Sequence, residues 1–261
     1  MRRSFKDLAT RCTPTLDDGP ETVWPSDPEL EKLSAMIDGL FIYASTIMKF
    51  IGDSGNPRHN LRVFFANHAG ATQGDELDQL YYRMVSSPKA KDSFELTCII
   101  VHLHAELSVR DLRCILPDSM DLALGPFSSV ISVPQNMDGK FHAYHSSFRE
   151  FLINSSRSRD YYVNASDCHR KIAIFCLRFL IKSLRRDICD IRNPSRFNNE
   201  VEDLDTRCRE NISTALQYCC IYWANHVSLA RMDGEILDGE ILSELTGEIV
   251  PQLAGNPEPP Q

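Results

Sequence analysis

The spacing of apolar residues constrains this chain most, because it follows a helical period over most of its length. In one segment, apolar residues recur every three or four positions, as they do on one face of an α-helix: Leu30, Leu33, Ile37, Leu40, Phe41, Ala44, Ile47, Met48 and Ile51. The same spacing returns over 77–84, 172–184 and 204–227. We therefore predict a mainly α-helical fold.

One segment departs from this pattern and predicts a β-hairpin. Val130–Val133 and Lys140–Tyr144 flank Asp138-Gly139, a dipeptide typical of tight hairpin turns. Short helical patterns precede these two strands, and apolar residues at helical spacing follow them over 148–152. This order of helices, a hairpin and a returning helix is the layout of a winged helix.

The changes of pattern predict five parts. Residues 1–27 contain prolines and polar residues and are expected to be loop-like or disordered. A helical segment over 28–91, a winged-helix domain over 92–156 and a second helical segment over 157–230 follow. The tail 231–261 repeats a five-residue string and ends in a proline-rich stretch, so we expect it to be loose.

Helix starts are predicted from capping residues. Ser108 and Asp111 form a capping box, in which each residue's side chain bonds the other's backbone, so a short helix is expected from Ser108 through Leu116. Asp27-Pro28 is expected to start the first helix, and Ser166 or Asp167 the long one after the winged helix.

Further helix boundaries are predicted from apolar runs. We expect a short helix over 61–66, a buried helix over 94–107 and a helix over 204–230. A weaker helix is expected over 121–130, interrupted by Gly125-Pro126. The 94–107 helix would carry His102 and His104 in different directions, as histidines at the edge of the core.

Composition and charge disfavour several classes of protein. The formal net charge is −8 and the sequence pI is about 5.5, which argues against a nucleic-acid partner, since that affinity depends on lysine and arginine. No apolar stretch approaches the roughly 20 residues of a membrane span. The nine cysteines form no CxxC pair, so neither a metal site nor disulfides are expected. We predict a cytoplasmic protein without nucleic-acid or membrane partners.

Motifs for nucleotide cleavage and hydrolysis are missing. A phosphate-binding loop needs a glycine-rich turn that ends in Gly-Lys-Ser/Thr, whereas Gly139-Lys140 is followed by Phe141. His145-Ser146-Ser147 has neither a strained nucleophile turn nor a third group to orient a base. We therefore predict that the chain is not an enzyme and needs no cofactor or metal.

Several strings, in order, resemble the end of the NACHT module and the following winged helix of fungal (basidiomycete) STAND NTPases. The resemblance covers about residues 24–230 and is carried by Trp24-Pro25-Ser26, Leu40–Thr46, Leu77–Tyr81, Leu107–Leu112, Phe141–Leu152 and Tyr218–His226. The family's P-loop, its magnesium-binding acidic strand and its WD40 repeats have no counterpart here. A truncated paralogue, a partial gene model and a cut-down regulatory protein remain open.

The resemblance implies a regulatory role through protein contacts. In the family, the winged helix packs on the nucleotide-binding domain and helps to hold the ADP-bound resting state. We therefore expect a non-catalytic interaction fragment of an NLR-like signalling protein, with a full-length NACHT relative as its candidate partner. Fungal members are associated with non-self recognition and programmed death. The oligomeric state is left open.

His145 is the single candidate site residue, and its role also comes from the resemblance. In animal NLR relatives, a histidine before a similar S-F-x-E-F-like string reaches the β-phosphate of ADP, and Tyr144–Phe151 places His145 at the matching position. An imidazole N–H can donate to a phosphate oxygen. The alternative is that His145 caps or packs at the junction between the wing and the next helix.

Two rival functions stand beside this one. A DNA-binding winged helix would carry basic residues on its third helix and wing, but 121–129 has no lysine or arginine and the wing has only Lys140. A scaffold for an unknown partner is the other alternative.

Overall fold

The computed structural model describes residues 25–37, 41–52, 57–67, 76–116, 124–193 and 195–230. The tail 231–261 and all but the last residues of the expected loop 1–27 lie outside this range. The described parts form two compact units. The described residues within 25–94, 124–133 and 142–162 form the first, and those within 95–116, 134–141 and 163–230 form the second.

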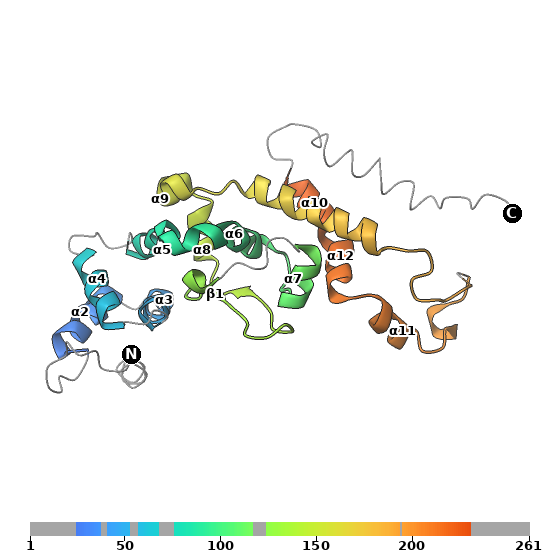
Figure 1. The fold of residues 1–261 in the computed structure, drawn as a ribbon, viewed down its shortest axis with the longest axis horizontal. Coiled ribbons are helices and arrows are strands. Elements are labelled where there is room, and N and C mark those ends of the chain that lie inside the picture. The colour runs from blue at the N-terminus through green and yellow to red at the C-terminus, as the bar shows by residue number, and fades with distance from the viewer. Residues whose placement is uncertain are drawn as a thin grey trace. The chain divides into compact units, whose positions relative to one another are not determined.

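The prediction of a mainly α-helical fold is confirmed (Figure 1). Among the described residues, the one sheet consists of two antiparallel strands. Within the same residues, no helix combines the length and the apolar character that crossing a bilayer requires. The boundary between the two units runs through the segment 92–156, which we expected to form one winged-helix domain.

The first unit is built mainly from helices. They are α2 (Asp27–Ile37), α3 (Phe41–Gly52), α4 (Pro57–Asn67), α5 (Glu76–Ser86), α8 (Ser147–Leu152) and α9 (Ser155–Ser158), with 3-10 helices η1 (Pro88–Ser93), η3 (Gly125–Phe127) and η4 (Arg159–Tyr161). The helix predicted over 61–66 is longer than expected. The first helix starts one residue early, because the Ser26 carbonyl accepts from the Leu30 N–H and Glu29 bonds the Ser26 N–H at 2.8 Å.

An aromatic cluster forms part of the core of this unit. The Tyr81 and Phe148 rings meet edge to face with centroids 5.1 Å apart, and Phe127 lies 6.2 Å from Phe148. Phe151 completes the cluster, and all four side chains are at most 1% exposed. Burial of each such ring stabilises the fold by about 1.5–3 kcal/mol, so α5 and α8 are held firmly together.

The strand pair lies in the same unit and is shorter than predicted. Strands β1 (Ile131–Ser132) and β2 (His142–Ala143) pair antiparallel, with Ile131 opposite Ala143. The prediction of a tight hairpin turn at Asp138-Gly139 is wrong. Nine residues separate the two strands, and Asp138 does not adopt the positive φ angle of such a turn. The loop Pro134–Phe141 belongs to the second unit and contacts the start of a helix of that unit.

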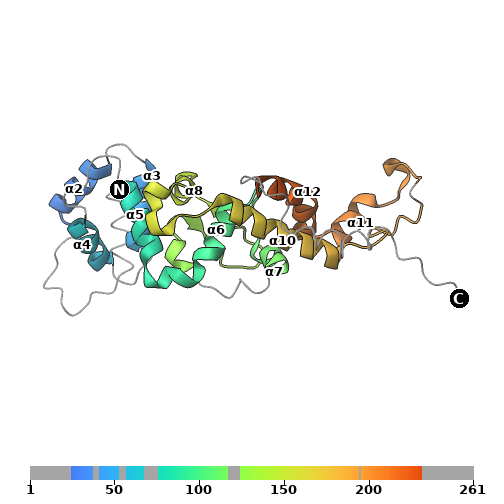
Figure 2. The same cartoon turned by 90° about the horizontal axis from the view of Figure 1, so that it is seen from above.

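The second unit contains α6 (Phe94–His102) except its first residue, α7 (Val109–Ile115), α10 (Ala165–Ser183), α11 (Leu204–Asn211), α12 (Thr214–Leu229) and the 3-10 helix η5 (Asn198–Glu200). Helices α10 and α12 pack side by side in both views (Figures 1 and 2), and α7 contacts both. Buried apolar residues fill this contact: Leu112, Ile115, Ile172, Ala173, Cys176, Leu177, Leu216 and Cys219.

The start of α7 confirms the predicted capping box. Ser108 Oγ accepts from the Asp111 N–H at 3.1 Å, and the Asp111 carboxylate accepts from the Ser108 N–H at 3.2 Å. The first two N–H groups of the helix donate to the Gly139 and Met137 carbonyls of the loop between the strands, at 3.1 and 2.9 Å. Side chain and loop together satisfy donors that a helix N-terminus otherwise leaves unpaired.

Three other predicted boundaries are wrong. Helix α6 ends at His102, whose ring Nδ1 bonds the Cys98 carbonyl at 2.7 Å and so satisfies an acceptor of the last turn. Asn164, not Ser166 or Asp167, caps α10. The helix expected over 204–230 breaks where Ser213 Oγ accepts from the Leu216 N–H and starts α12.

The weaker helix predicted over 121–130 is not a regular α-helix where it is described, and it is irregular at the predicted interruption. Residues 121–123 lie outside the described range, and Gly125–Phe127 forms a 3-10 helix. Pro126 has no N–H for a helical hydrogen bond, which explains why a regular α-helix does not form here.

Candidate functional site

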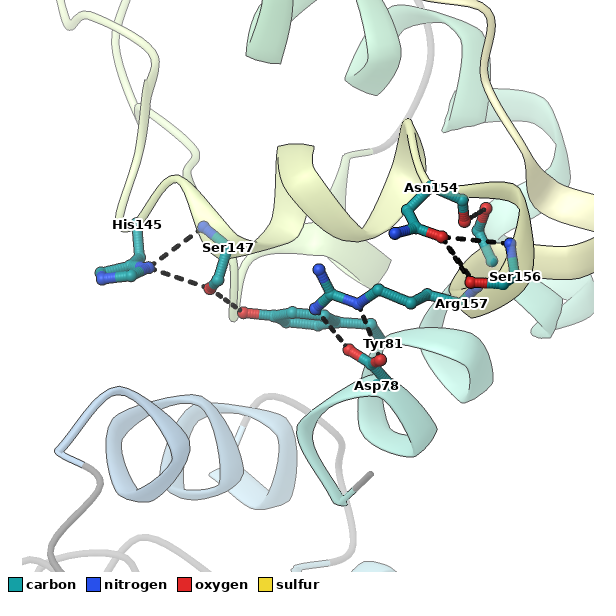
Figure 3. A network of polar contacts seen from close by, with 8 residues as sticks. Asp78, Tyr81, His145, Ser147, Asn154, Ser156 and Arg157 are labelled. Atoms are coloured by element: carbon teal, nitrogen blue, oxygen red, sulfur yellow. Dashed lines mark hydrogen bonds and ion pairs between the residues drawn. The ribbon is translucent and has the colours of Figure 1, made fainter. Parts of the chain in front are cut away.

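A chain of hydrogen bonds in the first unit links α5 to the start of α8 (Figure 3). The buried Tyr81 hydroxyl lies 2.8 Å from Ser147 Oγ, and Ser147 Oγ lies 2.9 Å from His145 Nδ1. Burial raises the pKa of Tyr81 above its ordinary value of 10.0, so the hydroxyl keeps its proton at neutral pH. The exposed His145 is therefore connected to the aromatic core through Ser147.

The hydrogen bonds of His145 assign its neutral tautomer. The Ser147 backbone N–H donates to His145 Nδ1 at 3.1 Å, so Nδ1 must be the unprotonated nitrogen. The proton of the neutral ring then lies on Nε2. Two roles were expected for His145. Capping the start of α8 uses only Nδ1, whereas binding a phosphate would use the Nε2–H.

Positive charge lies beside this histidine. The Lys49 ammonium of α3 lies over the ring of Tyr144, the residue before His145. Tyr144 is 40% exposed, and His142 packs edge to face against it. This edge of the first unit therefore combines a cation with an N–H donor, an arrangement that favours an anionic group.

An ion pair holds α9 against α5 in the same unit. Arg157 Nε and Nη2 donate to the two carboxylate oxygens of Asp78, at 2.8 and 2.6 Å. Both side chains are largely shielded, at 30% and 20% exposed, and this pairing raises the pKa of Arg157. Bidentate pairs of this kind are stronger and more specific than single contacts.

A pocket of about 470 Å³ opens beside that ion pair, lined by Asp78, Gln79, Tyr82, Arg83, Ser156, Arg157 and Arg159. Three arginines face a single aspartate in this lining, so the pocket prefers an anion. The Arg159 guanidinium also lies 5.6 Å from the centre of the Tyr82 ring. The arrangement suits a carboxylate or phosphate group and offers no nucleophile with a base.

The sequence predicted His145 as a site residue but did not indicate the residues around it. Asp78 and Arg157 are 79 positions apart, and no local pattern indicates that they meet. Tyr81 and Ser147 lie in strings that carry the family resemblance, yet their hydrogen bond could not be inferred from those strings. Comparisons of the chain with protein-family models, with curated proteins and with solved structures find no match.

Proposed function

We propose that this chain is a non-catalytic regulatory module that docks on the nucleotide-binding domain of a NACHT-type signalling protein. In the docked state His145 donates its Nε2–H to the terminal phosphate of bound ADP. The family resemblance suggests the partner, and the orientation of His145 carries the argument. Its Nδ1 accepts from the Ser147 N–H at 3.1 Å, which leaves the proton on Nε2 of an exposed ring.

The surroundings of His145 support this proposal physically. The donor is oriented before binding, since Ser147 is fixed by the Tyr81 hydroxyl at 2.8 Å and little side-chain freedom is lost on docking. Lys49 adds positive charge near the same edge. The arginine-lined pocket beside α5 supplies a second place for an acidic group of the partner.

The test measures ADP release in trans. A NACHT nucleotide-binding domain from a full-length relative is loaded with fluorescent ADP, and its dissociation is followed with and without the present chain. We expect the wild-type chain to slow dissociation and His145→Ala to abolish that effect. His59→Ala, which removes an exposed histidine of α4, is the matched control and should behave as wild type.

Two outcomes would reject the proposal. One is a wild-type chain that binds the domain without changing ADP release. The other is a His145→Ala variant that slows release as well as wild type does. Thermal unfolding of each variant shows whether the fold is kept, because loss of the Nδ1 cap alone would lower the melting temperature without a specific effect on ADP.

A further inference from the structure

Three histidines from three separate elements meet in the second unit. His104 follows the end of α6, His169 lies in α10 and His226 lies in α12. Each ring offers one nitrogen, and these three nitrogens all lie within 4.8 Å of one another. His169 and His226 are 3% and 0% exposed, whereas His104 is exposed, so the cluster is buried on one side and open on the other.

We propose that these three histidines bind a divalent transition-metal ion, with Zn²⁺ as the first candidate. Imidazole nitrogen is a ligand that suits zinc, copper and nickel, and three protein ligands with an open fourth position form a known type of zinc site. The sequence predicted no metal site, because closely spaced pairs of ligands are the signal for one and these three histidines are far apart in the chain.

The spacing of the two buried nitrogens fits such an ion after a small adjustment. His169 Nδ1 and His226 Nδ1 are 2.9 Å apart. Two nitrogens bound tetrahedrally at 2.0–2.1 Å from zinc lie about 3.3 Å apart. The two buried rings therefore need to separate only slightly, whereas the His104 nitrogen, which lies within 4.8 Å of the other two, has to move closer to complete the set.

The protonation state of His226 is compatible with a bound metal. The pKa of His226 is lowered to about 3, mainly by burial and further by the neighbouring His104 and His169. The ring is therefore neutral at neutral pH and keeps a lone pair for coordination. In the metal-free molecule the Nδ1–H of one of the two buried histidines, His169 and His226, donates a hydrogen bond to Nδ1 of the other. When the metal binds, that proton moves to Nε2 of its own ring, so the ion binds without the release of a proton.

Tyr218 supplies the outer contact that metal-binding histidines commonly have. Its hydroxyl lies 2.9 Å from His226 Nε2 and 3.3 Å from the backbone nitrogen of His104, whose N–H donates to it. With Nε2–H donating to Tyr218, His226 directs its Nδ1 lone pair toward His169. A ligating histidine usually donates its other N–H to an oxygen in this way, which fixes the ring and its tautomer.

The test uses the full chain after treatment with a chelator, titrated with Zn²⁺ in a calorimeter and with Co²⁺ in a spectrophotometer. We expect one ion per chain and a Co²⁺ spectrum of nitrogen and oxygen ligands without a thiolate charge-transfer band. His104→Ala should weaken binding at least about tenfold and keep the fold, because that side chain is exposed. His59→Ala is again the matched control and should bind as wild type.

Three outcomes would overturn the proposal: no stoichiometric binding of the ion, equal affinity in wild type and His104→Ala, or a thiolate band that assigns the ion to the cysteines. Tyr218→Phe adds an independent check, because it removes the oxygen that accepts from His226 and leaves the three ligands in place. It should lower the affinity for Zn²⁺, and unchanged affinity would contradict the coordination through Nδ1.

Discussion

Replacement of Ser108 by alanine should destabilise the second unit by about 2 kcal/mol. The substitution removes two hydrogen bonds of Ser108 Oγ, which accepts from the Asp111 N–H at 3.1 Å and donates to the Asp111 carboxylate at 2.6 Å. Loss of the cap costs about 1 kcal/mol. The second loss adds a similar amount, because Asp111 is only 8% exposed and its charged carboxylate loses a donor.

Two sets of contacts remain in the Ser108→Ala variant and limit the loss of stability. The Ser108 backbone N–H still donates to Asp111 at 3.2 Å. The loop carbonyls of Met137 and Gly139 still accept from the first N–H groups of α7. The helix should therefore start at the same residue in the variant.

Urea unfolding followed by circular dichroism gives the free energy of unfolding by linear extrapolation. Ser108→Thr keeps the hydroxyl and should recover most of the loss. Ser228→Ala is the matched control, since it removes an exposed serine of α12 in the same unit and should stay within about 0.5 kcal/mol of wild type. If Ser108→Ala changes stability no more than this control does, the capping box does not stabilise the unit as argued.

Four further predictions follow from other contacts. Gly139→Ala should destabilise the loop by about 1–3 kcal/mol, because a Cβ there would lie 2.6 Å from a proline side chain, whereas Gly125→Ala meets nothing within 4 Å and should be tolerated; melting temperatures compare the two. Asp78→Asn, which weakens the bidentate ion pair between α5 and α9, should cost about 1–3 kcal/mol in urea unfolding, while Asp138→Asn, in a pair that is 61% and 81% exposed, should cost under about 1 kcal/mol. Thiol labelling followed by peptide mass analysis should modify the exposed Cys114 in the native protein and, only after unfolding, the buried Cys98, Cys168, Cys176 and Cys219. Purified protein should show no ATP turnover above a heat-killed control, and measurable turnover would contradict the non-catalytic assignment.

Features that depend on neighbours within about one helical turn could be predicted from the sequence alone. Apolar residues at helical spacing predicted the mainly α fold, because each helix buries one face. The capping box was predictable for the same reason, since Ser108 and Asp111 are three positions apart and need no other element to meet. The position of the strand pair was also predicted, from the strings Val130–Val133 and Lys140–Tyr144, although the strands are only two residues long.

Packing between elements sets where several helices end and which polar groups meet. The segment 204–230 keeps its apolar period across the break at Ser213, so the period alone could not reveal two helices. Asp78 reaches Arg157 across 79 positions, and His169 reaches His226 across 57, because packed helices bring them together. Such contacts depend on how whole elements pack rather than on local spacing, which is why the sequence indicated His145 but neither its hydrogen-bonded neighbours nor the histidine cluster.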